Sequence, residues 1–498
     1  MRWTARDYLV SHGRSPGTLD AYHGGDTGER RLRRLLPCLL LVGLVLLGCQ
    51  GGLPGLRPRS ESEGAVYVYL QPLPPEAARL RFVLAGVSAL DRDGTEVPLS
   101  LALGEVSGRE DRRQRLLAAG PLPAGAYSGL VFRAKSAGLK GDEGESALLV
   151  PEAPTRIDFA FVVRRREGLV VALVLRYGES VDAAFRFAPV FSPYFPDRPA
   201  VGLMAFVANA RSNDITVFDK KSLQVFDVIA TGNRPSSMAL DQRTRKLYVA
   251  LAGEDTVEVI DVTAGRSADR IRLTPGDEPV SLALTPDGRT LFSANRGSNT
   301  VSVIDTAARA EVLKIPVGNG PRFVTLDRAG RRAFVFNTLS NSVTVIDVLG
   351  RVVIRSLPTD PDPVRGDFNR QGDRLYIIYE TTPFVTVVNP DTGKVAGRFP
   401  IRSGMDAIKV DPSTDLVYLG GRRELEVGVY EPFSVVAIDF LDTGAGVAYI
   451  ATDVEENALY LVCPDAKRVL VSSRVRRRIS GTVDVGDGPA WISVMGEN

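Results

Sequence analysis

The chain has 498 residues, of which 44% are hydrophobic and 24% charged, and its formal net charge is +2. This composition is typical of a globular protein long enough for two or three domains. Residues 1–48 hold 7 arginines and 4 acidic residues, so the rest of the chain has 54 basic and 55 acidic residues. A nearly neutral body lacks the basic surface that attracts nucleic acid, and we expect no nucleic-acid partner.

The segment 30-RRLRRLLPCLLLVGLVLLGCQ-50 has the layout of a secretory signal. Its arginines precede the apolar run Leu35–Leu47, which has the length of a signal-peptide core and is short for a membrane span. The run ends at 46-LLGC-49, which resembles the bacterial lipobox, where a small residue precedes a cysteine that becomes lipidated. The resemblance implies that residues 30–48 are a lipoprotein signal peptide and that Cys49 carries a covalent lipid.

The lipobox resemblance also implies a location. The residue after the cysteine is Gln50, not the aspartate that holds lipoproteins at the inner membrane of enteric bacteria. We therefore expect a bacterial cell-envelope protein anchored to the outer membrane and facing either the periplasm or the outside, because several acyl chains on one cysteine make a stable anchor. An ordinary signal peptide that happens to end in cysteine is the alternative. Residues 1–29 are polar and patternless, and we expect them to be a wrongly assigned or dispensable extension.

Cleavage before Cys49 would exclude several kinds of chemistry. Both histidines, His12 and His23, precede the cleavage site, and Cys463 would be the single unmodified thiol. Without histidine there can be no Ser-His-Asp or Cys-His nucleophile, and no histidine-ligated zinc or haem. A single thiol also forms no internal disulfide. We expect no catalytic residue, no metal and no cofactor other than the lipid.

Two different patterns follow the anchor. Residues 49–64 are rich in Gly, Pro and Ser and predict a flexible tether. Residues 65–194 alternate short β-forming runs with turn signals, which predicts a β-sandwich. The stretch 122-LPAGAYSGLVFRA-134 resembles a domain of unknown function that is typical of bacterial lipoproteins, and this implies a prealbumin-like sandwich. The proline-containing residues 195–202 predict a stiff linker.

From residue 203 onward the chain repeats itself. Four aspartates follow alternating β-forming runs at steps of 42, 44 and 42 residues, and other polar residues continue the series. Before each alternating run stands a run of the kind 334-FVFN-337, and a Gly-x-x-Pro loop such as 318-GNGP-321 leads into a further short strand. Four short strands in a unit of this length are the period of a β-propeller blade. Seven units therefore predict seven blades; the residues of the series are Asp219, Asp261, Asp305, Asp347, Asn389, Glu431 and Ser473.

These runs together resemble the YVTN-type propeller repeats of prokaryotic surface and envelope proteins. The resemblance implies an all-β chain with a seven-bladed β-propeller over residues 203–498. Blades five and six depart from the pattern where 402-RSGMD-406 and 442-DTGAG-446 replace the loop. The first unit starts at a second strand and the last ends in 490-AWISVMG-496, so we expect the C-terminal strand to pair with the first blade and close the ring.

The aspartate series has two interpretations. A ring of carboxylates would bind cations, but metal sites need oxygens that converge on one point. The series ends the third strand of each blade, opposite the Gly-x-x-Pro loops, where aspartate commonly accepts backbone N–H bonds and starts a turn. The replacement of aspartate by Asn389, Glu431 and Ser473 favours the turn role.

The Gly-x-x-Pro loops gather at one end of the strands, on the face where propellers usually bind. We expect Arg322 and Arg365 to point at the axis, because they begin innermost strands at equivalent positions. The alternative for each of these residues, taken singly, is an ordinary solvated loop charge with no role in binding. The candidate ligand-binding residues on this loop face are Arg211, Arg234, Arg296, Arg322, Arg365, Arg422, Glu380 and Asp406.

We interpret the chain as a lipid-anchored envelope protein that binds or scaffolds, with a propeller that recognises an envelope protein, a glycan or another ligand. The alternative is a propeller enzyme of the lactonase, sugar-oxidising or lyase type that uses Asp, Glu and Arg, with or without Ca²⁺. The fold alone does not exclude this. The uniformity of the repeats disfavours it, because a catalytic site breaks a repeat at specific loops.

Overall fold

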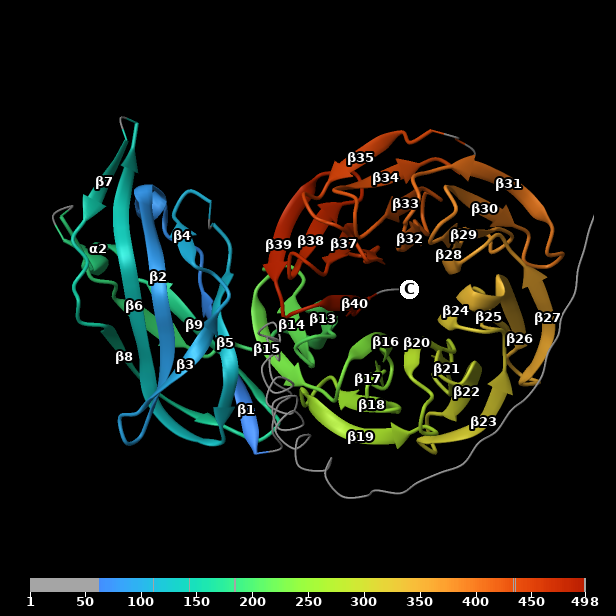
Figure 1. Cartoon of the computed structure of the whole chain (residues 1–498), viewed down its shortest axis with the longest axis horizontal. Helices are drawn as coiled ribbons and strands as arrows, with labels where there is room; N and C mark the ends of the chain where they lie inside the picture. The colour runs from blue at the N-terminus through green and yellow to red at the C-terminus, as the bar shows by residue number, and fades with distance from the viewer. Residues whose placement is uncertain are drawn as a thin grey trace, which may run out of the picture. The chain divides into compact units, whose positions relative to one another are not determined.

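The computed structural model describes residues 62–496 apart from 111, 143, 183, 184, 433 and 435. Within this range the chain forms an N-terminal curled β-sheet and then a seven-bladed β-propeller (Figure 1). The predicted signal peptide, Cys49 and all but the end of the predicted tether lie outside the described residues. None of the helices in the described part of the chain is long and apolar enough to cross a membrane.

The N-terminal module is built from short strands, with a 3₁₀ helix, η1, at Pro75–Arg79 and a short helix, α2, at Tyr177–Ser180. The first strand begins inside the predicted tether. The strands are β1 Glu63–Leu70, β2 Leu80–Asp91, β3 Glu96–Leu101, β4 Glu105–Ser107, β5 Arg115–Pro123, β6 Gly125–Gly141, β7 Gly144–Leu148, β8 Thr155–Val163, β9 Gly168–Leu175, β10 Val181–Asp182, β11 Arg186–Phe187 and β12 Phe191–Tyr194.

Ten strands of this module form one continuous sheet, which differs from the two separate sheets of a simple sandwich, and β10 and β11 pair with each other apart from it. Its main path runs β12, β9, β1, β5, β3, β2, β6, β7, and β3 pairs with both β5 and β2. The two halves of the curled sheet therefore enclose one core, to which Val68, Leu117, Phe82 and Phe132 all belong. Burying each large apolar side chain stabilises the fold by roughly 1.5–3 kcal/mol. The sandwich-like packing expected from the alternating pattern is confirmed.

The propeller contains seven four-stranded sheets, as the repeat predicted. A 3₁₀ turn, η2 (Val201–Leu203), precedes it and η3 (Thr338–Ser340) lies in blade four. The strands of blades one to four are β13 Met204–Asn209, β14 Asp214–Asp219, β15 Val225–Ala230, β16 Pro235–Asp241, β17 Lys246–Leu251, β18 Thr256–Asp261, β19 Arg266–Arg272, β20 Pro279–Leu284, β21 Thr290–Asn295, β22 Thr300–Asp305, β23 Ala310–Pro316, β24 Pro321–Leu326, β25 Arg332–Asn337, β26 Ser342–Asp347 and β27 Val352–Pro358.

The last three blades have the same order but shorter strands in blade six, where the repeat degenerates. Their strands are β28 Pro363–Phe368, β29 Leu375–Tyr379, β30 Phe384–Val388, β31 Val395–Pro400, β32 Ala407–Val410, β33 Val417–Gly420, β34 Glu426–Tyr430, β35 Asp439–Asp442, β36 Tyr449–Asp453, β37 Ala458–Cys463, β38 Arg468–Ser473 and β39 Ile479–Asp484, followed by β40 Pro489–Val494.

The ring closes through the two ends of the propeller sequence. Blade one has the order β15, β14, β13, β40, so the C-terminal strand supplies its innermost position. The pairing runs antiparallel from Ala205–Val494 to Asn209–Pro489. Figure 1 shows the red β40 beside the green β13 although these strands are almost 300 residues apart along the chain. The predicted closure is confirmed.

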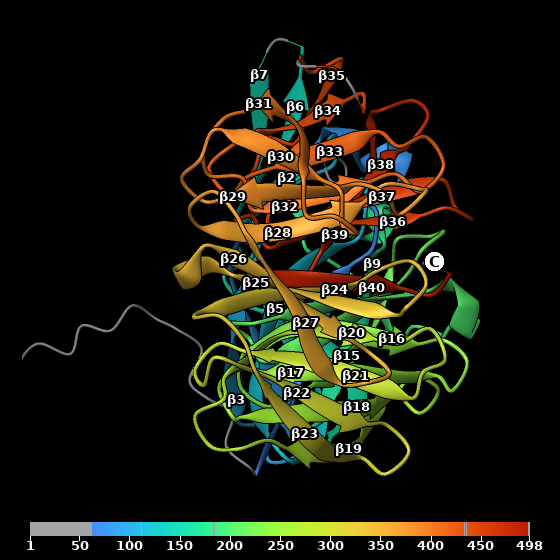
Figure 2. The same ribbon diagram turned by 90° about the vertical axis from the view of Figure 1, so that its right-hand side faces the viewer.

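Burial is greatest in the two middle strands of each blade and smallest in the outer strand. The second and third strands, such as β25 and β26, are almost wholly buried because neighbouring blades cover both of their faces. The outer strand β27 is exposed at most of its positions, and Figure 2 shows β23, β27 and β31 along the outer edge of the blades. Runs of the kind 334-FVFN-337 therefore form buried second strands.

Both faces of β1 are buried: one packs in the core of the curled sheet and the other packs against the propeller. Tyr67 and Tyr69 share an apolar cluster with Phe218 and Val225 of blade one and with residues of blade seven. The Tyr67 hydroxyl donates a hydrogen bond to Asp214 Oδ2 at 2.7 Å. At the start of β9 the backbones come so close that a Cβ on Gly168 would lie 2.1 Å from the Val228 carbonyl oxygen, so only glycine fits there.

Candidate functional site

The repeated aspartates are turn residues. Asp305 Oδ1 accepts the N–H groups of Ala307 and Ala308 at 2.9 and 2.8 Å. Asn389 Oδ1 accepts the equivalent N–H groups of Asp391 and Thr392 at 3.1 and 2.9 Å. Because the amide can replace the carboxylate, the position needs an acceptor and not a charge. The turn interpretation of the series is confirmed at these positions.

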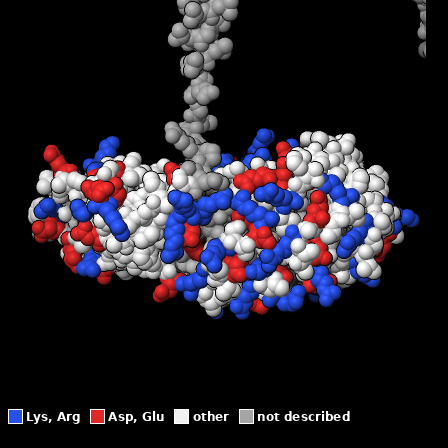
Figure 3. Space-filling view, turned by 90° about the horizontal axis from the view of Figure 1, so that it is seen from below, with Lys and Arg blue, Asp and Glu red and all other residues white. Residues whose placement is uncertain are grey.

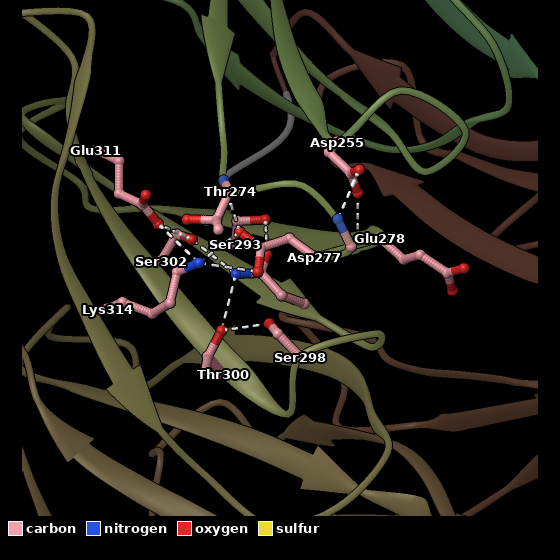
Figure 4. Close-up of polar contacts among 12 residues, drawn as sticks. Asp255, Thr274, Asp277, Glu278, Ser293, Ser298, Thr300, Ser302, Glu311 and Lys314 are labelled. Atoms are coloured by element: carbon pink, nitrogen blue, oxygen red, sulfur yellow. Dashed lines mark hydrogen bonds and ion pairs between the residues drawn. The ribbon is translucent and has the colours of Figure 1, made fainter.

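The repeated polar residues at the other end of the third strand also have structural partners. In blade three, Asn295 Nδ2 donates to Thr300 Oγ1 and Ser302 Oγ at 3.2 and 2.7 Å, and Figure 4 shows this cluster with the neighbouring pair of Asp277 and Lys314. Asp255 accepts backbone N–H groups from the next Gly-x-x-Pro loop, as Figure 4 also shows. Asn213, Asn299 and Asn341 make the corresponding loop contacts, and all four residues have a positive φ, which Asn and Asp tolerate best.

Four of the predicted loop-face residues form one ionic cluster, which we call the rim cluster: Arg322, Glu380, Asp406 and Arg422. Arg322 Nη1 lies 2.7 Å from Glu380 Oε2, and its Nη2 lies 3.4 Å from Asp406 Oδ1. Arg422 Nε lies 3.7 Å from the same Asp406 oxygen, and the Arg422 backbone N–H donates to Asp406 Oδ2 at 3.0 Å. The carboxylate of Asp406 therefore holds two arginines from different blades.

Arg365 lies beside the rim cluster but is held by aromatic rings. Its guanidinium carbon is 4.7 Å from the ring centres of Phe323 and Tyr449 and 5.3 Å from that of Trp491. Tyr449 and Trp491 stack on each other at 4.0 Å. We call these three rings the aromatic box. Cation–π contacts of this kind stabilise a desolvated guanidinium without giving its N–H groups an acceptor.

The residues of the aromatic box and Arg365 all occupy the same position of the propeller repeat. In β24 and β28 a bulge separates the first proline from the next paired residue, which is Phe323 in one strand and Arg365 in the other. Trp491 takes the same place after Pro489 in β40. Phe323, Arg365, Tyr449 and Trp491 are thus spaced by 42, 84 and 42 residues. We expected Arg365 to be equivalent to Arg322, which is wrong: Arg322 is the bulged residue of β24, and the corresponding residue of β28 is Val364.

The aromatic box borders a cavity of about 360 Å³ in the centre of the propeller. All seven innermost strands contribute to its wall, and most of the lining side chains are apolar. The charged residues Asp367 and Lys409 of the wall form an ion pair at 3.4 Å. The lining includes Met238, Leu240, Leu282, Leu284, Leu326, Ile408, Ile450 and Val494 as well as Arg365 and the aromatic box.

Arg365 combines buried N–H donors with a lowered pKa. Its Nε and Nη1 atoms are fully buried and have no hydrogen-bond partner, although the side chain as a whole is only half-buried. Burial lowers the pKa of Arg365 to about 10, with nearby Arg322 and Arg422 acting in the same direction. The guanidinium therefore stays charged at neutral pH.

Three of the predicted residues do not join this cluster. Arg211 bonds Asp487 Oδ1 through its Nε at 2.9 Å, on the loops of blades one and seven. Arg234 and Arg296 are exposed loop residues of blades two and three. Phe323, Tyr449 and Trp491 were not among the predicted residues, and their shared repeat position with Arg365 was the signal in the sequence that could have identified them.

A second, larger cleft of about 730 Å³ lies between the β8–β9 turn and blades one and two. Several of its charged groups are paired: Arg270 contacts Glu254 and Glu258 at 3.0 and 3.3 Å, and Asp227 lies 3.5 Å from Arg198. Burial raises the pKa of Asp227 to about 6 against the opposing effect of Arg198. Because these ions compensate one another, this cleft is a weaker candidate than the central cavity.

The described residues offer few other groups for metal binding or nucleophilic chemistry. No group of three or more His, Cys, Asp or Glu side chains within residues 62–496, as described, is arranged to hold a metal ion. Cys463 is buried, and burial raises the pKa of its thiol to about 11, so it is a packing residue and not a nucleophile. On the surface, Figure 3 shows Lys and Arg interspersed with Asp and Glu over one face.

Fold and site together define a seven-bladed β-propeller in which an arginine with buried N–H donors borders the central cavity. Residues 190–411 match a family model described as YNCE-like beta-propeller. No curated protein matches the sequence.

Two solved structures are similar to the propeller part of the chain. Hydrazine synthase of Kuenenia stuttgartiensis superposes with a TM-score of 0.50 at 21% identity, over 54% of this chain and 92% of that chain. A functionally unknown protein from Desulfotomaculum acetoxidans superposes with a TM-score of 0.52 at 11% identity, over 59% of this chain and 99% of that chain. At these identities the likeness concerns the fold alone.

Proposed function

We propose that this protein binds a small molecule in the central cavity of its propeller and is held at the bacterial outer membrane by a lipid on Cys49. The cavity of about 360 Å³ carries the binding role, because all seven innermost strands line it and one charged side chain with buried, unpartnered donors faces it. Cavities of roughly 300–1,000 Å³ with apolar walls and a few placed polar groups are typical small-molecule sites. A folded partner protein would not fit such a space, although the rim cluster remains available to one.

The envelope location rests on the sequence. The lipobox-like 46-LLGC-49, the following Gln50, the YVTN-type repeats and the lipoprotein-type stretch 122–134 all favour it. The curled N-terminal sheet then lies between the anchor and the propeller along the chain. In this arrangement it acts as a stalk that carries the propeller.

Binding is testable through tryptophan fluorescence. The chain contains two tryptophans, Trp3 and Trp491, and cleavage before Cys49 would remove Trp3. A Trp3→Phe variant makes Trp491 in the aromatic box the single reporter in uncleaved protein as well. A small-molecule fraction of the bacterial envelope should change the Trp491 emission saturably. If only the macromolecular fraction changes it, the small-molecule role is refuted.

The anchor is testable by metabolic labelling with a radioactive fatty acid. The wild type should carry label, and Cys49→Ala should lose it. Cys38→Ala is the matched control because Cys38 lies within the apolar run and should leave the labelling unchanged. Full labelling of the Cys49→Ala protein would refute the anchor.

A further inference from the structure

The charges around the aromatic box do not balance. Three arginines, Arg322, Arg365 and Arg422, are grouped with two carboxylates, Glu380 and Asp406. Both carboxylates are already engaged by Arg322 or Arg422. Arg365 is therefore the surplus positive charge, and it is the most deeply buried of the three.

The N–H donors of Arg365 also lack partners. Two of its nitrogen atoms are buried without a hydrogen-bond acceptor. Leaving a buried charged donor unsatisfied is costly, and proteins keep such a group mostly where a ligand or a network satisfies it. The aromatic rings stabilise the cation through their faces, and neither of these two nitrogens has an acceptor, so an acceptor from a ligand would satisfy them.

The cavity wall defines the rest of the ligand. Its charged pair, Asp367 and Lys409, is internally neutralised, and Asp367 Oδ2 also accepts the N–H of Val410 at 2.8 Å. The leucines Leu240, Leu282, Leu284 and Leu326 supply apolar surface. A ligand that matches this wall has one negative charge at one end and an apolar body of modest size.

We propose that the ligand of the central cavity is an organic acid with a single carboxylate and a small apolar body, bound as its anion with Arg365. This inference rests on the proposed binding role. A carboxylate matches the planar guanidinium through two parallel N–H···O bonds and neutralises the one surplus charge. Phosphate fits less well, because it carries more charge than the site has to offer and has no apolar part to contact the leucines.

The test uses the full-length Trp3→Phe protein and follows the Trp491 emission. Hexanoate and benzoate are the carboxylate probes, hexanamide and benzamide their neutral isosteres, and inorganic phosphate the alternative anion. We expect the carboxylates to bind roughly 10- to 100-fold more tightly than the amides, the range that follows from hydrogen bonds to a charged group. Phosphate should produce no saturable change.

Two substitutions connect the preference to Arg365. Arg365→Met should remove the advantage of carboxylate over amide, while Arg365→Lys should keep part of it because the charge remains without the planar fork. Arg234→Gln is the matched control, since it removes one exposed arginine from the same loop face and should leave all affinities unchanged. The comparison of acid with amide uses a protein with an unaltered aromatic box. It therefore tests the proposal even if a variant at Arg365 fails to fold.

The outcomes separate the two proposals. Equal binding of acids and amides, binding of phosphate, or undiminished carboxylate binding by Arg365→Met would overturn the carboxylate assignment. In each of these cases a saturable response of Trp491 to the envelope fraction would leave the binding role standing. No response of Trp491 to any probe or envelope fraction would overturn both.

Discussion

One repeat position, occupied by residues of very different chemistry, creates the candidate site. In blades two and three this position is serine, and Ser237 Oγ and Ser281 Oγ accept the N–H groups of Leu282 and Val324 in the next blade. In blades four, five, seven and one the same position holds Phe323, Arg365, Tyr449 and Trp491 respectively. The hydrogen bonds between inner strands are thus replaced by rings and a cation that extend toward the channel. The candidate site therefore lies where the side chain at this repeat position differs between blades while the strand pairing stays the same.

A substitution at Asp305 tests the structural role of the repeated aspartates. Asp305→Ala removes the acceptor for two backbone N–H groups and should lower the free energy of unfolding by about 1 kcal/mol. Asp305→Asn should cost less than about 0.5 kcal/mol, because Asn389 makes the same two bonds in blade five.

The measurement is equilibrium unfolding in urea, with and without Ca²⁺. Neither variant should change its response to the ion. A Ca²⁺-dependent stabilisation of the wild type that Asp305→Ala abolishes would revive the interpretation of the series as a cation site.

At the scale of elements, β40 decides whether the ring is closed. Its residues pair with β13, and the chain after it is held by a buried lysine from blade one. Lys220 Nζ lies 2.6 Å from both Asp453 Oδ2 in blade seven and the carbonyl oxygen of Met495. One side chain therefore ties together the first blade, the last blade and the end of the chain.

Lys220→Met should be strongly destabilising, by about 3–5 kcal/mol, because it leaves the carboxylate of Asp453 buried without its cation. The neighbouring Lys221 is 62% exposed and lies 4.0 Å from Glu456, so Lys221→Met is the control and should change stability by less than about 0.5 kcal/mol. Urea unfolding compares the two. Deletion of residues 489–498 should weaken the propeller further, and an unchanged melting temperature after that deletion would contradict the closure.

At the scale of the whole molecule, the curled sheet and the propeller share buried surface. Asp484 of β39 accepts hydrogen bonds from Arg115 and from the backbone of Leu116, and it also pairs with Arg113 at 2.7 Å. Gln114 both donates to the carbonyl and accepts from the N–H of Val225 in β15. The sheet thus contacts blades seven and one, which are the two blades at the closure of the ring.

This shared surface should make the two modules unfold together in a single calorimetric transition. Asp484→Ala should destabilise the protein by roughly 1–3 kcal/mol, because it removes the acceptor of three groups at the contact. Asp465→Ala, at a side chain that is 81% exposed, is the control and should have no measurable effect. Two separate transitions in the wild type would show that the contact does not couple the modules.

Much of the fold followed from the sequence, because a repeat carries the same constraints many times. The number of blades, their four-stranded pattern and the closing strand were all predicted. The site was predicted in part. The rim cluster and Arg365 were among the candidates, but the aromatic box was not, since rings at inner-strand positions also read as ordinary core.

By itself, the sequence determined the period, the number of blades and the turn role of Asp305, because each depends on local backbone geometry that is written into neighbouring residues. Only the tertiary structure decided that Arg365 lies among Phe323, Tyr449 and Trp491 and has buried donors without an acceptor. It also decided that both faces of β1 are buried. Contacts of this kind join residues that are tens to hundreds of positions apart, and closing the ring brings them together.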